Sequence, residues 1–174
     1  MRIYVGMHKK GHTLVEMLVY IGILSMTTVL VVNLIIFMAR SFFNFVVTRD
    51  LSSGAQVGIE RIVRDIRRAD SIDISTSIFN ASPGRLSLNT TDQYSGSTTT
   101  IEFFVDAGQF VIKEGAGSPV TLTPSTVSVD ELIFRRIVAS TTEAVKVEFE
   151  ITASIGSVTR TERFYTTGVL RKDY

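Results

Sequence analysis

The hydrophobic pattern of this chain starts with a long, unbroken apolar segment. Residues 17–39 carry no charged side chain. As an α-helix that rises about 1.5 Å per residue, this segment would extend roughly 35 Å, whereas the hydrocarbon core of a bilayer is about 30 Å thick. The pattern therefore predicts a helix long enough to cross a membrane once.

A second helical pattern follows, in which only one face is apolar. Apolar residues recur at helical spacing from residue 59 to residue 70. The members of this stripe that we expect to form a helix–sheet core are Ile59, Ile62, Val63 and Ile66. No proline precedes Pro83, so one continuous helix from about residue 13 to 70 is predicted.

The opposite face of this amphipathic segment is charged. It carries Glu60, Arg61, Arg64, Asp65, Arg67 and Arg68. Glu60 with Arg64, and Arg61 with Asp65, are spaced as i,i+4 ion pairs. We interpret the arginines as a solvated helix face, with a docking surface for an acidic partner as the alternative. Upstream, Gly54 and Gly58 have the spacing of a close helix-packing motif, or they merely soften the helix.

After residue 70 the period becomes twofold, which predicts β-strands. Residues 71–75 alternate, and the polar stretch 89–99 is typical of a loop. Alternation resumes at Ile101, and Asp106-Ala107-Gly108 predicts a turn. The sequence thus favours an antiparallel sheet after the helix.

The C-terminal strands are the most regular. The apolar parity changes at Asp130-Glu131, which predicts a β-bulge. Residues 145–155 alternate without interruption, and Gly156-Ser157 suits a hairpin turn. That turn would place Phe149 opposite Phe164 and Glu150 opposite Arg163. The predicted fold class is α+β, a long N-terminal helix that covers an antiparallel sheet.

Charge on either side of the apolar segment predicts its orientation. Arg2, His8, Lys9 and Lys10 precede it, whereas Arg40 is the only basic residue immediately after it. The positive-inside rule therefore places the N-terminus in the cytoplasm. Thr13 and Glu16 also form a capping-box pattern that would start the helix.

The run Lys9-Lys10-Gly11-His12-Thr13-Leu14-Val15-Glu16 resembles the processing site of type IV pilins and type II secretion pseudopilins. Gly11, Thr13, Leu14 and Glu16 match that family's pattern, and His12 stands where phenylalanine is usual. The resemblance implies a positively charged leader, cleavage after Gly11 by prepilin peptidase, and N-methylation of His12 as the new first residue. It also implies that Glu16, with Thr13 and Leu14, acts in assembly, where the carboxylate pairs with the amino terminus of a neighbouring subunit.

The same resemblance implies a pilin-like organisation. Residues 1–11 would be a cytoplasmic leader peptide, 12–40 a transmembrane and assembly helix, and 41–174 an extracytoplasmic domain. The chain would be a structural subunit, and a minor one, of a type IV pilus, a competence pilus or a type II secretion pseudopilus. Its partners would be other pilin or pseudopilin subunits, the peptidase, an assembly platform in the bacterial inner membrane, and lipid before assembly.

Composition narrows the remaining classes of function. The chain has no cysteine, and both histidines, His8 and His12, precede the apolar segment. The later part therefore lacks Ser-His and Cys-His nucleophile arrangements and the usual zinc ligands, and we expect no enzyme, metal or cofactor. A net charge of +1 gives no reason to expect nucleic-acid binding. The competing class is an uncleaved, single-pass anchored binding domain outside the cytoplasm.

Overall fold

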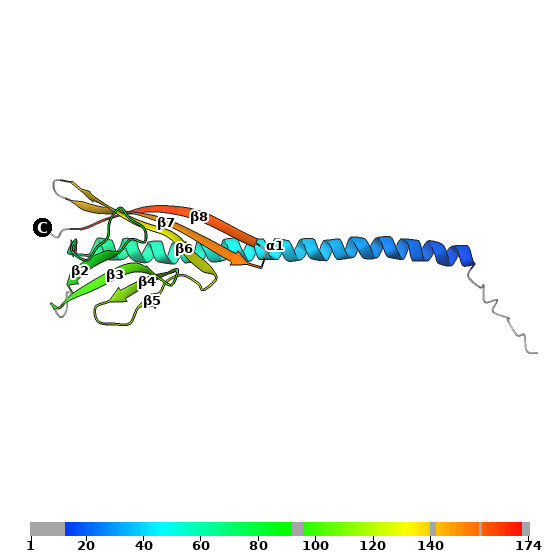
Figure 1. Ribbon diagram of the computed structural model, residues 1–174, viewed down its shortest axis with the longest axis horizontal. Helices are drawn as coiled ribbons and strands as arrows, with labels where there is room; N and C mark the ends of the chain where they lie inside the picture. Colours follow the sequence, from blue (N-terminus) through cyan, green and yellow to red (C-terminus); the bar gives the residue numbers. More distant parts are fainter. Residues whose placement is uncertain (1–12, 92–95, 140–141, 157, 172–174) are drawn as a thin grey trace, which may run out of the picture. The chain divides into compact units, whose positions relative to one another are not determined.

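One helix, α1 (Leu14–Arg68, 55 residues), dominates the N-terminal part of the chain. The computed structural model describes residues 13–91, 96–139, 142–156 and 158–171 (Figure 1). The chain divides into two compact units, Met1–Phe42 and Phe43–Tyr174, and α1 contributes to both. The predicted continuous helix is confirmed, because no proline interrupts it and Thr13 caps its start.

The part of α1 in the first unit exposes apolar side chains, among them Leu18 and Leu30. A window of this helix has a mean hydropathy of 2.4 with none of its residues buried, so the helix is long and apolar enough to cross a membrane. Hydroxyl groups here bond within the helix. Ser25 Oγ donates to the Ile21 carbonyl at 2.8 Å. Such internal bonding leaves few groups that need water, as an apolar environment requires.

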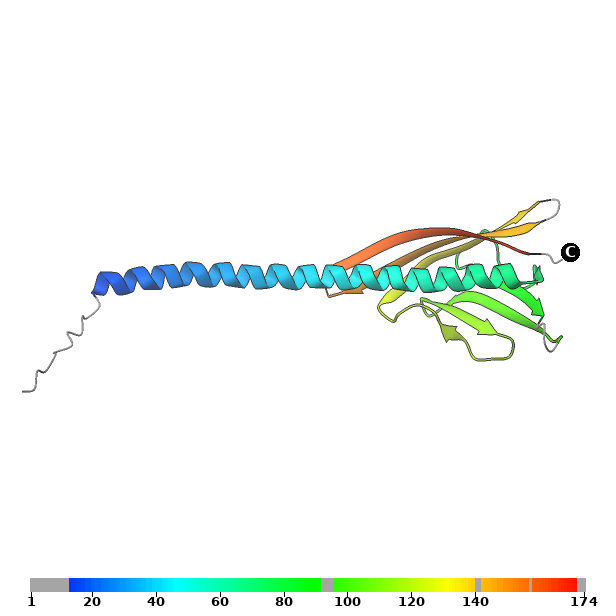
Figure 2. The ribbon, with the colours of Figure 1, turned by 180° about the vertical axis from the view of Figure 1, so that it is seen from behind.

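The second unit contains two antiparallel sheets. The first has the order β1-β2-β3-β4-β5 and the second the order β6-β7-β8. The strands are β1 (Ser71–Ile72), β2 (Leu86–Thr91), β3 (Thr98–Asp106), β4 (Gln109–Glu114), β5 (Val120–Thr121), β6 (Val127–Val138), β7 (Glu143–Ile155) and β8 (Val158–Val169). Within this unit, β8 lies along one side of α1 and β3 to β5 along the other (Figure 2). The class is α+β, but the single predicted sheet is two sheets.

Several local predictions are confirmed. Asp106 pairs with Gln109 across a tight turn in which Ala107 and Gly108 both have positive φ, 47° and 75°. The register of β6 shifts between Val129 and Glu131, as the change of parity predicted. In the β7–β8 hairpin, Phe149 lies opposite Phe164 and Glu150 opposite Arg163. Each of these features depends on residues close in sequence.

Two strand predictions are wrong. The stretch 89–99 is not a loop at its ends, because β2 continues to Thr91 and β3 begins at Thr98, and the two pair. Residues 71–75 do not form one strand, because β1 ends at Ile72. The carboxylate of Asp73 accepts hydrogen bonds from the Ser75 N–H at 3.0 Å and the Thr76 hydroxyl at 2.7 Å. These bonds fold the segment into a turn.

The core of the second unit lies between α1 and the sheets. Ile62 and Ile66 are 1% and 0% exposed, whereas Ile59 and Val63 are half-buried beside this core. The helix side of the core continues through Val47, Leu51, Ala55 and Ala69. Burying a valine, leucine or isoleucine side chain supplies about 1.5–3 kcal/mol. The stripe read from the sequence therefore lies partly along the margin of the core, with its centre at Ile62 and Ile66.

The glycines Gly54 and Gly58 let the sheets approach the helix closely. A Cβ on Gly54 would lie 3.0 Å from Pro124 Cδ, and one on Gly58 would lie 3.0 Å from Phe110 Cδ1. The two glycines are therefore explained without a helix–helix contact and without local flexibility of the helix. They accommodate side chains that pack on α1 from the β-sheet part of the same unit.

Gly168 of β8 provides a test of this packing. A Cβ there would lie 2.8 Å from Ile66 Cγ2 and 2.9 Å from Ile66 Cδ1. We expect Gly168→Ala to lower the free energy of unfolding by about 1–3 kcal/mol, because the methyl group overpacks the core. Thermal unfolding of the purified protein measures this, with Thr167→Ala at the exposed neighbouring position as the control. Equal melting temperatures for the two variants would contradict the close contact.

Candidate functional sites

The processing residues predicted from the sequence lie outside the described part of the chain. Lys9, Lys10, Gly11 and His12 belong to this group. The description begins at Thr13, whose hydroxyl accepts a hydrogen bond from the Glu16 N–H at 3.3 Å, while its carbonyl accepts one from the Met17 N–H at 3.2 Å. Thr13 is thus the N-cap of α1.

Glu16 lies in the first turn of α1, where its negative charge suits the positive end of the helix dipole. Its side-chain Oε1 accepts a hydrogen bond from the Tyr20 hydroxyl at 3.1 Å. Leu14 is exposed at 82%. The Glu16 carboxylate therefore lies at the border of the uncharged segment, hydrogen-bonded to Tyr20 one helical turn further on.

A second cluster of charges lies on α1 in the second unit, and it corrects the view of this face as uniformly solvated. The Asp65 side chain is only 5% exposed. Arg61 Nε donates to Asp65 Oδ2 at 2.6 Å, which confirms that pair, and Arg61 also pairs with Glu114 of β4. The hydrogen bond to Asp65 raises the pKa of the Arg61 guanidinium. Arg61 is thereby fixed to the five-stranded sheet.

The predicted Glu60–Arg64 pair is replaced by other contacts. Glu60 Oε1 accepts a hydrogen bond from Gln56 Nε2 at 2.8 Å. Arg64 Nε instead lies 3.5 Å from Asp65 Oδ1. Burial of Asp65 makes it the stronger attractor for nearby cations, because the low local dielectric strengthens its charge interactions.

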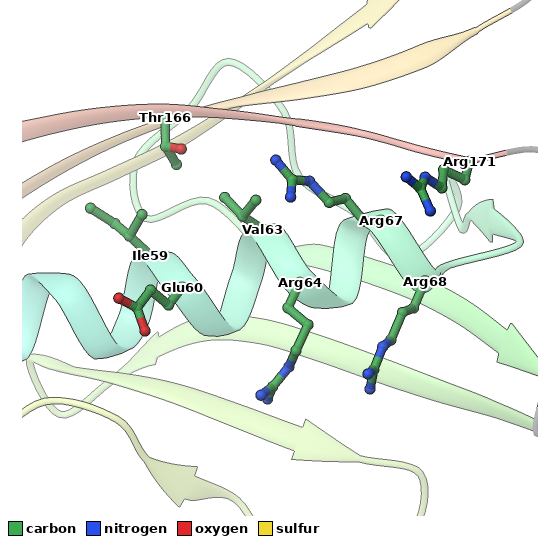
Figure 3. A pocket seen from close by; sticks show the side chains of 8 residues that line it. All are labelled: Ile59, Glu60, Val63, Arg64, Arg67, Arg68, Thr166 and Arg171. Atoms are coloured by element: carbon green, nitrogen blue, oxygen red, sulfur yellow. The ribbon is translucent and has the colours of Figure 1, made fainter.

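An open groove of about 520 Å³ lies beside α1 near the C-terminal end of the helix (Figure 3). Ile59 and Val63 contribute its apolar part, and Thr166 contributes from β8. Its charged lining consists of Glu60, Arg64, Arg67, Arg68 and Arg171. The groove thus has four cations and one carboxylate, which is already hydrogen-bonded to Gln56.

The cations enter the groove from both walls. In Figure 3, Arg67 extends from the helix toward β8, and Arg171 extends from the chain after β8 toward the helix. Within the described residues, neither Arg67 nor Arg171 forms an ion pair with a carboxylate. Arg171 was not among the residues predicted from the sequence, because no local pattern shows that it lines the same groove as the end of α1.

A metal site would require several ligating side chains close together. No group of three or more His, Cys, Asp or Glu side chains among them could hold a metal ion. The carboxylates near the groove are engaged by arginines or by Gln56. With four arginines in its lining, the groove can attract anions.

Comparisons with known proteins add no assignment. No protein-family model, no curated protein and no solved structure matches this chain.

Proposed function

We propose that this chain is a structural subunit, and a minor one, of a type IV pilus or a type II secretion pseudopilus. In this proposal prepilin peptidase removes residues 1–11 on the cytoplasmic side of the bacterial inner membrane. The subunit is then assembled with other pilins through residues 12–40 by an inner-membrane platform. The remaining chain, from residue 41, is a pilin-like domain outside the cytoplasm.

The observation that carries the proposal is the dual character of one helix. The first part of α1 exposes apolar side chains and has no charge from residue 17 to 39. The second part buries Val47, Leu51, Ile62 and Ile66 against two antiparallel sheets. A subunit that leaves a membrane for a filament needs such a helix, because its apolar part must be covered first by lipid and then by neighbouring helices.

The position of Glu16 also supports a filament subunit. A carboxylate at the border of an apolar segment costs free energy unless a partner compensates its charge. Cleavage after Gly11 would create an α-amine, which is cationic at neutral pH because its unperturbed pKa is about 8. A neighbouring subunit could supply that cation. An anchored domain that is never cleaved is the alternative, and its single-pass helix would remain in lipid.

The state of the N-terminus distinguishes these two functions. We expect the mature wild-type protein to lack residues 1–11 in cells with an active prepilin peptidase, and His12 to carry the methyl group. Gly11→Leu should leave the precursor uncut, because a side chain obstructs access to the backbone at the cleavage site. Intact-mass spectrometry of the membrane fraction measures both results.

Gly6→Leu is the matched control, since it changes a glycine of the same leader away from the cleavage site. It should be processed like the wild type. A wild-type protein that keeps Met1 in the presence of active peptidase would rule out the filament subunit and favour the anchored domain.

A further inference from the structure

Strand β8 is a long sheet edge that the described residues leave open. Sheet edges invite pairing with other chains, and proteins usually blunt them by shortening, bulges or cover. The edge strands β1 and β5 have two residues each. The edge strand β6 carries a bulge and lies beside β3 and β4 of the other sheet.

By contrast, β8 runs for 12 residues and pairs only with β7 among the described strands. Its register with β7 has no shift from Val158 to Val169, and it contains no proline. In an antiparallel pair, one alternate set of backbone N–H and C=O groups bonds to the neighbour, and the other set faces the opposite side. The outer set of β8 is therefore available to a further strand.

The open edge of β8 borders the arginine-lined groove. Thr166 of β8 and Arg171, which follows the strand, line the groove together with Arg67 of α1. Arg64 and Arg68 line it as well, and Figure 3 shows them extending from the helix on the side away from β8. A strand added to β8 would thus lie beside Arg67 and Arg171.

A helix end accounts for only part of this charge. Arg67 and Arg68 stand in the last turn of α1, where cations stabilise the negative end of the helix dipole. That role does not require Arg171, which comes from another element and brings a further cation to the same groove, with no carboxylate partner among the described residues. The positive charges of Arg67 and Arg171 repel each other, and an anion bound between them would offset this repulsion.

We propose that the β8 edge binds an extended, carboxylate-bearing segment of another protein, which adds a strand to the three-stranded sheet and places its acidic side chains in the groove. Backbone pairing supplies the binding surface, and Arg67 and Arg171 select acidic sequences, which is the usual division of roles in strand addition. This binding site lies within the second unit alone and does not depend on cleavage or filament assembly.

A second copy of this chain is a poorer occupant. Antiparallel pairing of two β8 strands would bring Arg160 of each copy to the other's edge, while Arg163 already pairs with Glu150 and Glu131. Glu162 is the one acidic residue of β8, so self-pairing brings no acidic sequence to Arg67 and Arg171. Charge complementarity therefore favours an acidic partner over self-pairing.

The test uses the full-length chain in mild detergent and a fluorescent peptide in which glutamate alternates with valine. We expect this peptide to bind, and the version with glutamine in place of glutamate to bind much more weakly. A glutamate peptide with every backbone nitrogen methylated should also fail, because it cannot donate the backbone hydrogen bonds. Fluorescence anisotropy measures binding, and hydrogen exchange should show new protection of amides along β8.

Substitutions in the groove connect the peptide to the proposed site. Arg67→Gln combined with Arg171→Gln should weaken binding of the glutamate peptide about tenfold, since two exposed charge pairs are lost. Arg49→Gln combined with Lys113→Gln removes the same charge away from β8 and the groove, and this double variant should bind as the wild type does. Unchanged thermal melting shows that each variant is folded.

Three results with the peptide would overturn the proposal: no binding of the glutamate peptide, equal binding to both double variants, or binding without protection of β8. Occupation of the β8 edge by another molecule would also overturn it. Protection of β8 that grows with protein concentration alone would identify a second copy, and protection that appears in nanodiscs only when phosphatidylglycerol replaces phosphatidylcholine would identify an anionic lipid.

Discussion

Replacing Ile66 by aspartate should unfold the second unit under conditions in which the wild-type protein is stable. Ile66 is 0% exposed, and its side chain lies against Gly168 of β8. An aspartate there would have to bury an unpaired carboxylate or open the core, and changes of this kind cost more than about 4 kcal/mol. Many domains are stable by only about 5–15 kcal/mol. The same result is expected for Ile62→Asp.

Milder changes at these two positions give a graded comparison. Ile62→Ala and Ile66→Ala should each lower the free energy of unfolding by about 2–5 kcal/mol, because they remove buried methyl groups and leave a cavity. Near-UV circular dichroism during heating of the detergent-solubilised protein reports this loss of packing.

Val57→Asp is the control, because Val57 lies on the same helix and is 50% exposed. It should change the melting temperature little. If Ile66→Asp and Val57→Asp melt alike, α1 does not pack on the sheets at Ile66.

Replacing Glu16 by alanine should prevent incorporation into filaments while leaving the subunit folded and processed. This prediction rests on the proposed function. The N-cap bond of α1 uses the backbone N–H of Glu16, not its side chain, so alanine retains it. Insertion into the membrane should be no worse, since a charge in the apolar layer costs about 2.5–3.5 kcal/mol on insertion scales. The attraction to a neighbour's amine is what disappears.

Recovery of the variant with sheared filaments, relative to its abundance in the membrane, measures this effect. Glu16→Asp should recover little assembly, because the shorter side chain withdraws the charge. Tyr20→Phe is the matched control. It removes the hydroxyl that donates to Glu16 at 3.1 Å but keeps the carboxylate, so it should assemble.

Normal incorporation of Glu16→Ala would reduce Glu16 to a residue of the helix cap. It would also fit a subunit at the tip of the filament, which has no partner amine ahead of it. Cross-linking of the variant to other pilins would separate these two explanations.

The sequence by itself determined the features that depend on near neighbours along the chain. Thr13 caps the start of α1, and the lack of proline lets the helix continue unbroken to Arg68, since capping and helix breaking act over a few residues. The turn at Ala107-Gly108 and the register of β7 with β8 followed from turn chemistry and alternation. The bulge after Val129 followed from a change of parity.

Only the tertiary structure decided which elements meet. Alternation shows that a strand has two faces, but it does not name the neighbour of that strand, so one predicted sheet became two. Asp65 looked solvated by helical spacing, yet it is buried, with Arg61 bridging it to Glu114 of a distant strand. Phe110 likewise approaches Gly58 from a distant segment. Arg67 and Arg171, far apart in sequence, line the same groove beside the open edge of β8. Such contacts depend on how the whole chain packs, and no local pattern encodes them.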